Sequence, residues 1–249
     1  MKISYFKIGL ALFLFILTGC GAEQNLKKGE EHLALGEYFD AATQFKQAYQ
    51  KTPIKERDRR GMIANRMALC YEKINLTQKA IAAYHNAGRY HKLTDNEQLR
   101  LGRLLLKNGQ YKEAEKLFIS LQAEHNSDSL LIANSLMSAR MAPQWKKAGS
   151  RYEVKKMTVF NSRRAEYSPM LMGDQSEYLY FTSTRDDAQG ANNNGITGTK
   201  SGDIFRSEKD NKGNWKKPVP VEGELNTAFD EGACAFSPDQ RTMYLTQCA

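Results

Sequence analysis

The sequence has few of the residues on which catalysis, metal binding and covalent cross-linking depend. Its 249 residues include only four histidines and four cysteines. The histidines lack the spacing of a metal site, and no GxSxG, HExxH, CxxC or GxGxxG motif occurs. We therefore predict that the protein is not an enzyme and that it binds neither a metal nor a cofactor.

Long runs of like charge are also absent. The formal net charge is +8, but no five consecutive residues carry the same charge. A mild, dispersed excess of this kind does not favour nucleic-acid binding. Two polar stretches are expected to be surface loops. Residues 186–195 lack the alternating acids of a calcium loop, and residues 195–203 lack the glycine that precedes the lysine of a phosphate loop.

The N-terminus carries an export signal. The basic segment MKISYFK precedes ten residues, IGLALFLFIL, which suit a signal peptide and are short for a membrane span. The stretch LTGC, residues 17–20, resembles the lipobox of bacterial lipoproteins. The resemblance implies cleavage after residue 19 and a diacylglycerol on the Cys20 thiol, while the residues after Cys20 do not indicate which leaflet the anchor faces. The alternative is an ordinary signal peptide over residues 1–20 with a chance cysteine, and both take the protein out of the cytoplasm.

The remaining cysteines differ in their surroundings. Cys70 lies in a helical apolar pattern and is expected to be a core residue. Cys234 and Cys248 flank the last predicted hairpin, and export permits a disulfide. A turn at Asp239-Gln240, however, would place Cys234 opposite residue 245, so whether these two cysteines pair is left open.

The part of the chain after residue 20 repeats itself. Small residues recur at Ala41, Ala80 and Ala114, and each is followed one helical turn later by an aromatic residue. Upstream of each lies another small residue, where two helices must approach closely. The matching positions are Gly29, Gly36, Tyr38, Ala41, Phe45, Ala48 and Pro53, then Met67, Ala68, Tyr71, Ala80, Tyr84 and Ala87, then Leu101, Gly102, Gly109, Tyr111, Ala114 and Phe118.

This pattern resembles the tetratricopeptide repeat, a helix–turn–helix unit of about 34 residues. The second unit departs from it, with Asn75 and Thr77 where glycine and tyrosine are usual. The resemblance implies an α-solenoid over residues 21–142, because one unit cannot bury its apolar face alone. Residues 94–97 are predicted to form a capping box. A last helix from about Asp128 to Met141 would cap the stack, with Ser127 as its N-cap and Pro143 beyond its end.

The first helices of such units line a groove that holds a peptide or a partner helix. The resemblance places six residues in this groove: Glu30, Asn65, Leu69, Lys73, Arg103 and Lys107. We take Asn65, Lys73, Arg103 and Lys107 as candidate partner-binding residues, since their side chains suit backbone carbonyls or an acidic partner. The alternative is that each one is a solvated surface residue.

After a linker at residues 143–153, helical periodicity stops and short β-branched and aromatic runs alternate with turns. Residues 209–214 are predicted to be a hairpin turn. The predicted strands are Val154–Phe160, Tyr167–Leu171, Tyr178–Thr184, Asp203–Ser207, Trp215–Val221, Ala233–Phe236 and Met243–Gln247.

This part of the chain also repeats itself, and the two copies align without a gap over their first half. Asn161-Ser162 aligns with Asn226-Thr227, and Glu166 aligns with Glu231. The strands around Tyr180 and Tyr244 follow with a one-residue slip. The Ser-Pro-Asp turn at residues 237–239 and the run YLYFTS at residues 178–183 resemble the WD40-like, TolB-type β-propeller repeat, although Gln240 replaces the usual glycine.

A propeller blade has four strands, and four to eight blades close a ring. Residues 154–249 hold about one and a half blades, so we expect an incomplete β-propeller in a fragment of a longer protein. A natural short chain with a degenerate tail is the alternative, although such an open edge is usually covered. The expected fold class is therefore multidomain α then β: a tetratricopeptide α-solenoid followed by an incomplete β-propeller.

The order of lipobox, helical repeats and propeller resembles the PorE-type lipoproteins of the type IX secretion system, in which an OmpA-like domain follows. The resemblance implies an outer-membrane-anchored periplasmic scaffold that binds proteins through its helical repeats and links a secretion apparatus to the cell envelope. Peptidoglycan would be held only by the missing C-terminal domain. The alternatives left open are the N-terminal part of a propeller-gated exported peptidase and a nutrient-uptake lipoprotein.

Overall fold

The structure, a computed structural model, describes residues 21–125, 130–190 and 194–248. The chain divides into two compact units, and the boundary between them in the sequence lies between Arg151 and Tyr152. Each unit is described by itself. The predicted lipidation site, Cys20, and the predicted N-cap, Ser127, lie outside the described residues. Among the described residues, no helix combines the length and the apolar character needed to cross a membrane.

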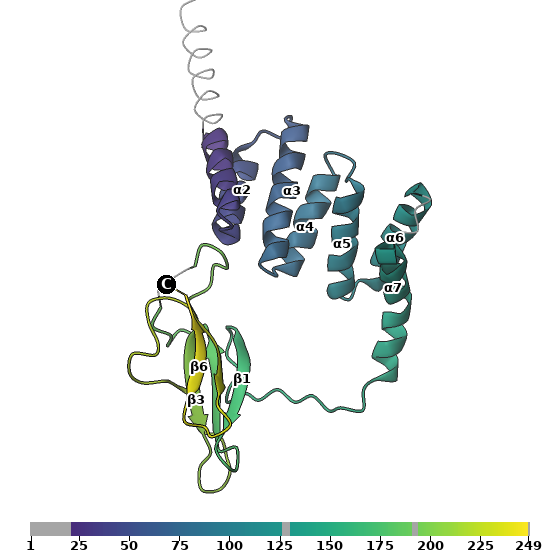
Figure 1. Ribbon diagram of the computed structural model, residues 1–249. Helices are drawn as coiled ribbons and strands as arrows, with labels where there is room; N and C mark the ends of the chain where they lie inside the picture. The colour runs from purple at the N-terminus through teal and green to yellow at the C-terminus, as the bar shows by residue number, and fades with distance from the viewer. Residues whose placement is uncertain (1–20, 126–129, 191–193, 249) are drawn as a thin grey trace, which may run out of the picture. The chain divides into compact units, whose positions relative to one another are not determined.

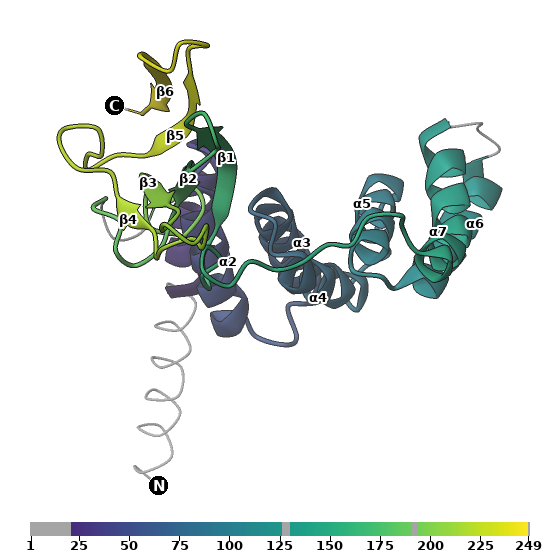
Figure 2. The ribbon, with the colours of Figure 1, turned by 90° about the horizontal axis from the view of Figure 1, so that it is seen from below.

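The first unit consists of antiparallel helices that pack in sequence order (Figures 1 and 2). A helix over residues 21–34 comes first. It is followed by α2 (Tyr38–Lys51), α3 (Arg57–Lys73), α4 (Thr77–Gly88), α5 (Asp95–Lys107), α6 (Tyr111–His125) and α7 (Leu130–Ala148). This is the arrangement of a tetratricopeptide-type helical repeat, with one continuous apolar core along the stack.

Small residues let the paired helices approach closely, as the repeat pattern predicts. A Cβ atom added at Gly29 would lie 2.6 Å from the Phe45 ring, and one added at Gly102 would lie 2.5 Å from the Phe118 ring. Both rings are fully buried. No side chain larger than hydrogen fits at these two glycines without moving an aromatic ring, so the small–aromatic pairs fix the distance between the helices.

The turns inside the helical pairs explain why the second unit tolerates its departure from the pattern. Gly36 and Gly109 have φ angles of +77° and +79°, and Asn75 occupies the equivalent turn with a φ of +63°. Asparagine is one of the few residues other than glycine that adopts this left-handed conformation readily. Asn75 therefore performs the same chain reversal as the glycines of the neighbouring units.

The predicted capping box is confirmed at the start of α5. The Glu97 N–H donates to Thr94 Oγ1 at 3.4 Å, and the Thr94 N–H donates to Glu97 Oε2 at 2.8 Å. Two backbone donors at the helix N-terminus are thereby satisfied reciprocally.

The predicted end of the last helix is wrong. Pro143 lies inside α7, which continues to Ala148. An interior proline costs a helix about 3 kcal/mol, but it does not always end one. The helix ends instead at Gly149, whose φ is +74° and whose N–H donates to the Trp145 carbonyl oxygen at 3.1 Å. A glycine in this conformation is the common helix stop signal.

The second unit contains two antiparallel sheets. One has the strand order β1-β2-β3-β4, formed by β1 (Glu166–Met172), β2 (Tyr178–Ser183), β3 (Asp203–Glu208) and β4 (Val219–Pro220). The other pairs β5 (Glu231–Phe236) with β6 (Met243–Gln247). The described strands make one four-stranded and one two-stranded sheet, and they do not close a ring.

One predicted strand is absent and another is much shorter than predicted. Residues 154–157 have no strand structure and residues 158–160 form a turn, because no described strand lies beside them to pair their backbone. The side chain of Val154 is accordingly 91% exposed. The strand predicted at Trp215–Val221 shrinks to Val219–Pro220, since prolines at 218 and 220 cannot donate to the ladder.

The internal repeat of the second unit is confirmed as a structural repeat. The Ser162 N–H and hydroxyl both donate to the Glu166 carboxylate, at 3.1 and 2.5 Å. The Thr227 N–H and hydroxyl donate to the Glu231 carboxylate in the same way, at 3.1 and 2.6 Å. The same pair of hydrogen bonds therefore forms at the start of β1 and at the start of β5.

The strand registers confirm the predicted one-residue slip. Met170 pairs with Tyr180 in the first sheet, and Ala235 pairs with Tyr244 in the second. The connection from Ala235 to Tyr244 is one residue shorter than that from Met170 to Tyr180, so the slip lies in the turn. The predicted pairing of Cys234 with residue 245 is also confirmed, and both Cys234 and Cys248 are free thiols.

The turn between β5 and β6 shows why glycine is usual where this chain has Gln240. Gln240 has a φ of +59°, a conformation that glycine adopts without strain. The Ser237 hydroxyl donates to Asp239 at 2.6 Å and the Gln240 N–H donates to the Ser237 carbonyl oxygen at 2.8 Å. These bonds hold the turn despite the bulkier residue.

Polar side chains as well as apolar ones join the two sheets: Thr182 of β2 donates to the Gly232 carbonyl oxygen of β5 at 2.8 Å, and Asn226, in the connection before β5, bonds to β3. Asn226 accepts from the Ile204 N–H at 2.8 Å and donates to the carbonyl oxygens of Ile204 and Val221, at 3.0 and 3.1 Å. It thereby completes the ladder of β3 at the point where β4 ends. The equivalent residue in the first copy, Asn161, is exposed and its side chain makes no hydrogen bond within the described residues.

Replacing Gly102 by alanine tests the close helix approach. We expect Gly102→Ala to destabilise the protein by about 1–3 kcal/mol, because the new methyl group overlaps the Phe118 ring. Gly88→Ala is the matched control, since its Cβ would lie 3.6 Å from Leu93 and the change favours helix by up to about 1 kcal/mol. Denaturant unfolding followed by helical circular dichroism measures both; equal effects would contradict the steric account.

A second pair of variants tests the polar bridge between the sheets. Asn226→Ala is expected to cost about 2–4 kcal/mol, because it leaves buried backbone groups of β3 without partners. Asn161→Ala is expected to change stability by less than about 0.5 kcal/mol in this chain, since its side chain is exposed. Hydrogen exchange at the Ile204 amide measures the difference. Retained protection in Asn226→Ala would show that the bridge is not needed.

Candidate functional site

The predicted groove residues lie on one face of the first unit, which we call the groove face. It is formed by the helix over residues 21–34, α3 and α5, and polar pairs join these helices. Arg66 contacts Glu30 at 3.1 Å, and Arg100 contacts Glu72 at 3.1 Å. Because each pair spans two of the three helices, their side chains share one surface.

The groove face is hollowed between α3 and α5. A cavity of about 220 Å³ is lined by Asn65, Arg66, Leu69, Tyr84, Thr94, Asn96, Glu97 and Arg100. At its edge the Tyr84 hydroxyl donates to Glu72 at 3.1 Å. Burial, with a further contribution from the Glu72 charge, raises the pKa of Tyr84 well above its ordinary value. The Tyr84 phenol therefore stays protonated at neutral pH, and its hydrogen bond orients the Glu72 carboxylate.

The structure separates the four candidate binding residues into two kinds. Asn65 donates to Glu97, and Lys107 donates to Asn75, so both are already engaged within the chain. Lys73 and Arg103 are exposed, and their side chains make no ion pair or hydrogen bond within the described residues. Lys73 and Arg103 therefore have no partner to lose when a ligand binds, whereas Lys107 keeps its charge but is bonded to the neutral amide of Asn75. The choice between a binding role and a solvated surface role stays open for each of the four.

Apolar side chains accompany these cations at helical spacing. On α3, Leu69 lies one turn from Lys73 and two turns from Met62, whose side chain is 42% exposed. On α5, Leu99 and Leu106 are partly buried and flank Arg103. The groove face therefore combines an apolar floor with positive charge.

The positive charge of the chain belongs to the helical unit. Residues 21–148 contain 21 basic and 14 acidic residues, whereas residues 149–249 contain 13 basic and 14 acidic ones. Many basic residues of the helical unit are neutralised by neighbouring carboxylates, as in the pair of Arg140 with Glu115 at 2.8 Å. A partner is therefore attracted by an excess that is local to this unit.

The second unit uses its charged residues for structure. Arg185 is buried, donates to the Phe160 carbonyl oxygen at 2.7 Å and to Ser183 Oγ at 2.9 Å, and stacks over the Phe205 ring. The Gln189 N–H donates to Asp203 at 2.7 Å, and burial raises the pKa of the Asp203 carboxyl. No nucleophile–base pair occurs among the described residues of this unit.

Cysteine chemistry is also absent from the described helical core. Cys70 is fully buried in α3, as predicted, and burial raises the pKa of its thiol to about 12. A thiol with this pKa carries almost no thiolate near neutral pH and is inert.

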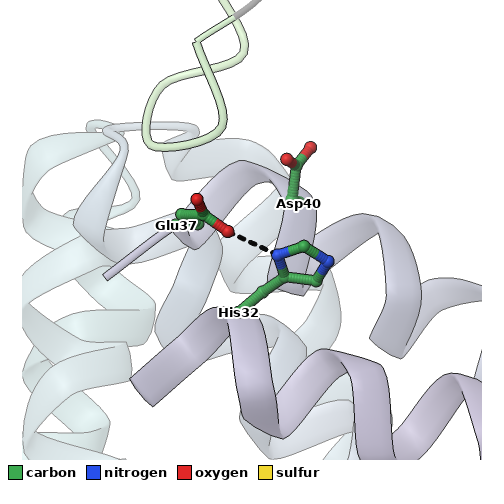
Figure 3. Close-up of side chains that lie close together, drawn as sticks. All are labelled: His32, Glu37 and Asp40. Atoms are coloured by element: carbon green, nitrogen blue, oxygen red, sulfur yellow. Dashed lines mark hydrogen bonds and ion pairs between the residues drawn. The ribbon is translucent and has the colours of Figure 1, made fainter. Parts of the chain in front are cut away.

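One cluster escaped the sequence analysis. His32, Glu37 and Asp40 bring three potential metal ligands together at the turn before α2 (Figure 3). The spacing H-x4-E-x2-D around Gly36 is the only sequence signal for it, and it becomes meaningful only once the turn is known.

Neither a protein-family profile nor any curated protein sequence matches the chain. Solved structures are similar to it at low identity. The Sgt2 TPR domain from Aspergillus fumigatus matches at 18% identity, over 55% of this chain and 87% of that one, with a TM-score of 0.40. The C-terminal TPR-containing domain of a putative FK506-binding protein from Plasmodium falciparum matches at 19%, over 53% and 94%, with a TM-score of 0.44. The Yersinia enterocolitica type III secretion chaperone SycD, in complex with a peptide of the translocator YopD, matches at 16%, over 49% and 93%, with a TM-score of 0.39.

Proposed function

We propose that the protein is an interaction scaffold whose groove face binds a segment of a partner protein. The observation that supports this most directly is the pair of exposed, unneutralised cations, Lys73 and Arg103, beside the cavity on that face. Stacked helical repeats present long continuous surfaces of this kind, and such surfaces suit extended chains or helices.

The chemistry of the groove face defines the class of partner. Lys73 and Arg103 favour carboxylates, and Arg103 in particular suits a bidentate contact with a side-chain or terminal carboxylate. Met62, Leu69 and Leu106 favour apolar side chains between those contacts. The proposed ligand is therefore a peptide segment in which acidic residues alternate with apolar ones.

Peptide selection on the purified chain tests this proposal. The tightest peptide from a displayed random library is expected to be acidic and apolar, and its dissociation constant is measured by fluorescence anisotropy. The double variant Lys73→Glu with Arg103→Glu is expected to weaken binding at least about tenfold, because it reverses both free charges on the groove face.

A control with the same change of net charge separates the groove face from a general field effect. Lys46→Glu with Lys116→Glu alters exposed cations on α2 and α6, the second helices of their units. This control is expected to change the affinity less than about threefold. Equal losses in the two double variants would refute a specific groove site.

We further propose that the scaffold is exported and anchored to the outer membrane through a lipid on Cys20. The support is the LTGC stretch after a short apolar run. Two or three acyl chains make a stable anchor, where a single one binds only reversibly. The periplasm-facing orientation is part of this proposal.

Metabolic labelling with an alkyne-tagged fatty acid tests the anchor. Incorporation is expected for the natural sequence and for Cys248→Ser, in which an exposed cysteine is removed. Cys20→Ser is expected to lose the label and to leave the membrane fraction. Labelling that persists in Cys20→Ser would contradict the lipobox assignment.

The second unit supports a proposal that it consists of successive blades of a WD40-like β-propeller. In the alignment of its two copies, Val154-Lys155 matches β4, and Asn161 matches Asn226. In the second copy this segment lies against β3, whereas in the first copy its backbone pairs with no described strand. A cavity of about 720 Å³ opens beside it, lined by Phe160, Asn161, Tyr167, Leu171 and Trp215 among others. A further blade would fill this space.

A scaffold with these parts is suited to link a secretion apparatus to the cell envelope, as the resemblance to PorE-type lipoproteins implies. The lipid would hold the membrane and the groove face would hold a component of the apparatus.

A further inference from the structure

The turn between the first helix and α2 gathers side chains that have no part in the groove. The helix over residues 21–34 ends, Gly36 reverses the chain with a φ of +77°, and the Glu37 N–H donates to the His32 carbonyl oxygen at 2.9 Å. Asp40 follows Glu37 at a spacing of three residues and so lies on the same side of the helix start. The backbone thus holds His32, Glu37 and Asp40 together.

The three side chains place potential ligand atoms near one another. One atom from each lies within 4.8 Å of the other two, and His32 Nδ1 lies 2.5 Å from Glu37 Oε2 (Figure 3). All three residues are half-buried. This is the only group of three potential metal ligands at such distances within the described residues.

Two of these side chains bond to each other, whereas the third, Asp40, has no side-chain partner in the described part of the chain and lies in the first turn of α2, where a helix N-terminus favours an acid. His32 and Glu37 bond to each other, which accounts for their approach. The side chain of Asp40 makes no hydrogen bond or ion pair within the described residues, although it is half-buried and close to a second carboxylate. Like charges at short range repel unless a cation lies between them.

We propose that His32, Glu37 and Asp40 form a zinc-binding site. One imidazole nitrogen with two carboxylate oxygens suits Zn²⁺, which prefers four ligands and accepts both donor types. The His32–Glu37 hydrogen bond opens when zinc binds, because two ligands of one tetrahedral zinc ion lie more than about 3 Å apart. Calcium and magnesium prefer larger all-oxygen sets and fit this group poorly. Three protein ligands leave the fourth position to a water molecule. The two carboxylates balance the charge of the ion.

The site joins the end of one helix to the start of the next, so zinc stabilises the first helical pair. A ligand that binds only the folded state raises stability in proportion to the logarithm of its concentration. Zinc binding is therefore read out as an increase in the melting temperature of the helical unit, with no activity required.

Thermal unfolding with zinc chloride tests the proposal on the purified chain. All variants carry Cys248→Ser, which removes the exposed thiol as a competing ligand. The parent is expected to gain about 5 °C at saturating zinc, and to gain nothing at the same concentrations of magnesium or calcium.

Asp40→Asn is the decisive variant, because it removes the third ligand while leaving the His32–Glu37 bond intact. It is expected to weaken zinc binding at least about tenfold, since even outer-sphere partners of a metal change its affinity about 10–100-fold. His85→Ala is the matched control: His85 also faces a glutamate, Glu113, at 3.3 Å, but no third ligand joins them within the described residues. It is expected to keep the full zinc response.

Two results would overturn the proposal. One is a parent chain whose melting temperature does not respond to zinc. The other is an Asp40→Asn response equal to that of the parent, which would assign any zinc effect to the histidine pair or to other surface sites. The peptide experiment on Lys73 and Arg103 does not involve these residues, so the two proposals fail independently.

Discussion

The close contact between a glycine and an aromatic ring in the first and third helical pairs determines the rest of the first unit. Gly29 and Gly102 leave just enough room for Phe45 and Phe118, and this fixes how near the two helices lie. Pairs of equal spacing stack side by side, and stacking brings the first helices of successive units onto one surface. The cavity and the cross-helix ion pairs of the groove face exist because this spacing is repeated.

Polar contacts play the corresponding part in the second unit, where Asn226 bonds the second copy to β3 at the point where the backbone ladder is incomplete. Buried polar groups are costly when unpaired, so such fully satisfied contacts select one arrangement of the sheets over others.

Local sequence patterns were sufficient to predict most of the fold. The small–aromatic spacing predicted the helical pairs, residues 94–97 predicted a capping box, and the alignment of Glu166 with Glu231 predicted matching hairpins. The predictions that were wrong depended on something absent from the local pattern. Val154–Phe160 has the composition of a strand but no neighbouring strand to pair with. Pro143 did not end the last helix, which continues to the glycine stop signal at Gly149.

The candidate sites were less predictable than the fold. Helical spacing could place Asn65 and Lys107 on a common face, but it could not show that Glu97 and Asn75 already occupy them. Those pairings depend on how the helices face one another. The His32 cluster was missed for the same reason, because its members converge only after the Gly36 turn is formed.

The ion pairs between helices of the groove face limit how strongly this face attracts an acidic ligand. Arg66 and Arg100 are paired with Glu30 and Glu72, so few cations of this face, Lys73 and Arg103 among them, are left to attract an acidic ligand. Attraction between a few exposed charges is screened over about 8 Å at physiological ionic strength. Ligand capture on this face is consequently short-ranged, and most of the discrimination between ligands falls to the fit of apolar side chains against Met62, Leu69 and Leu106.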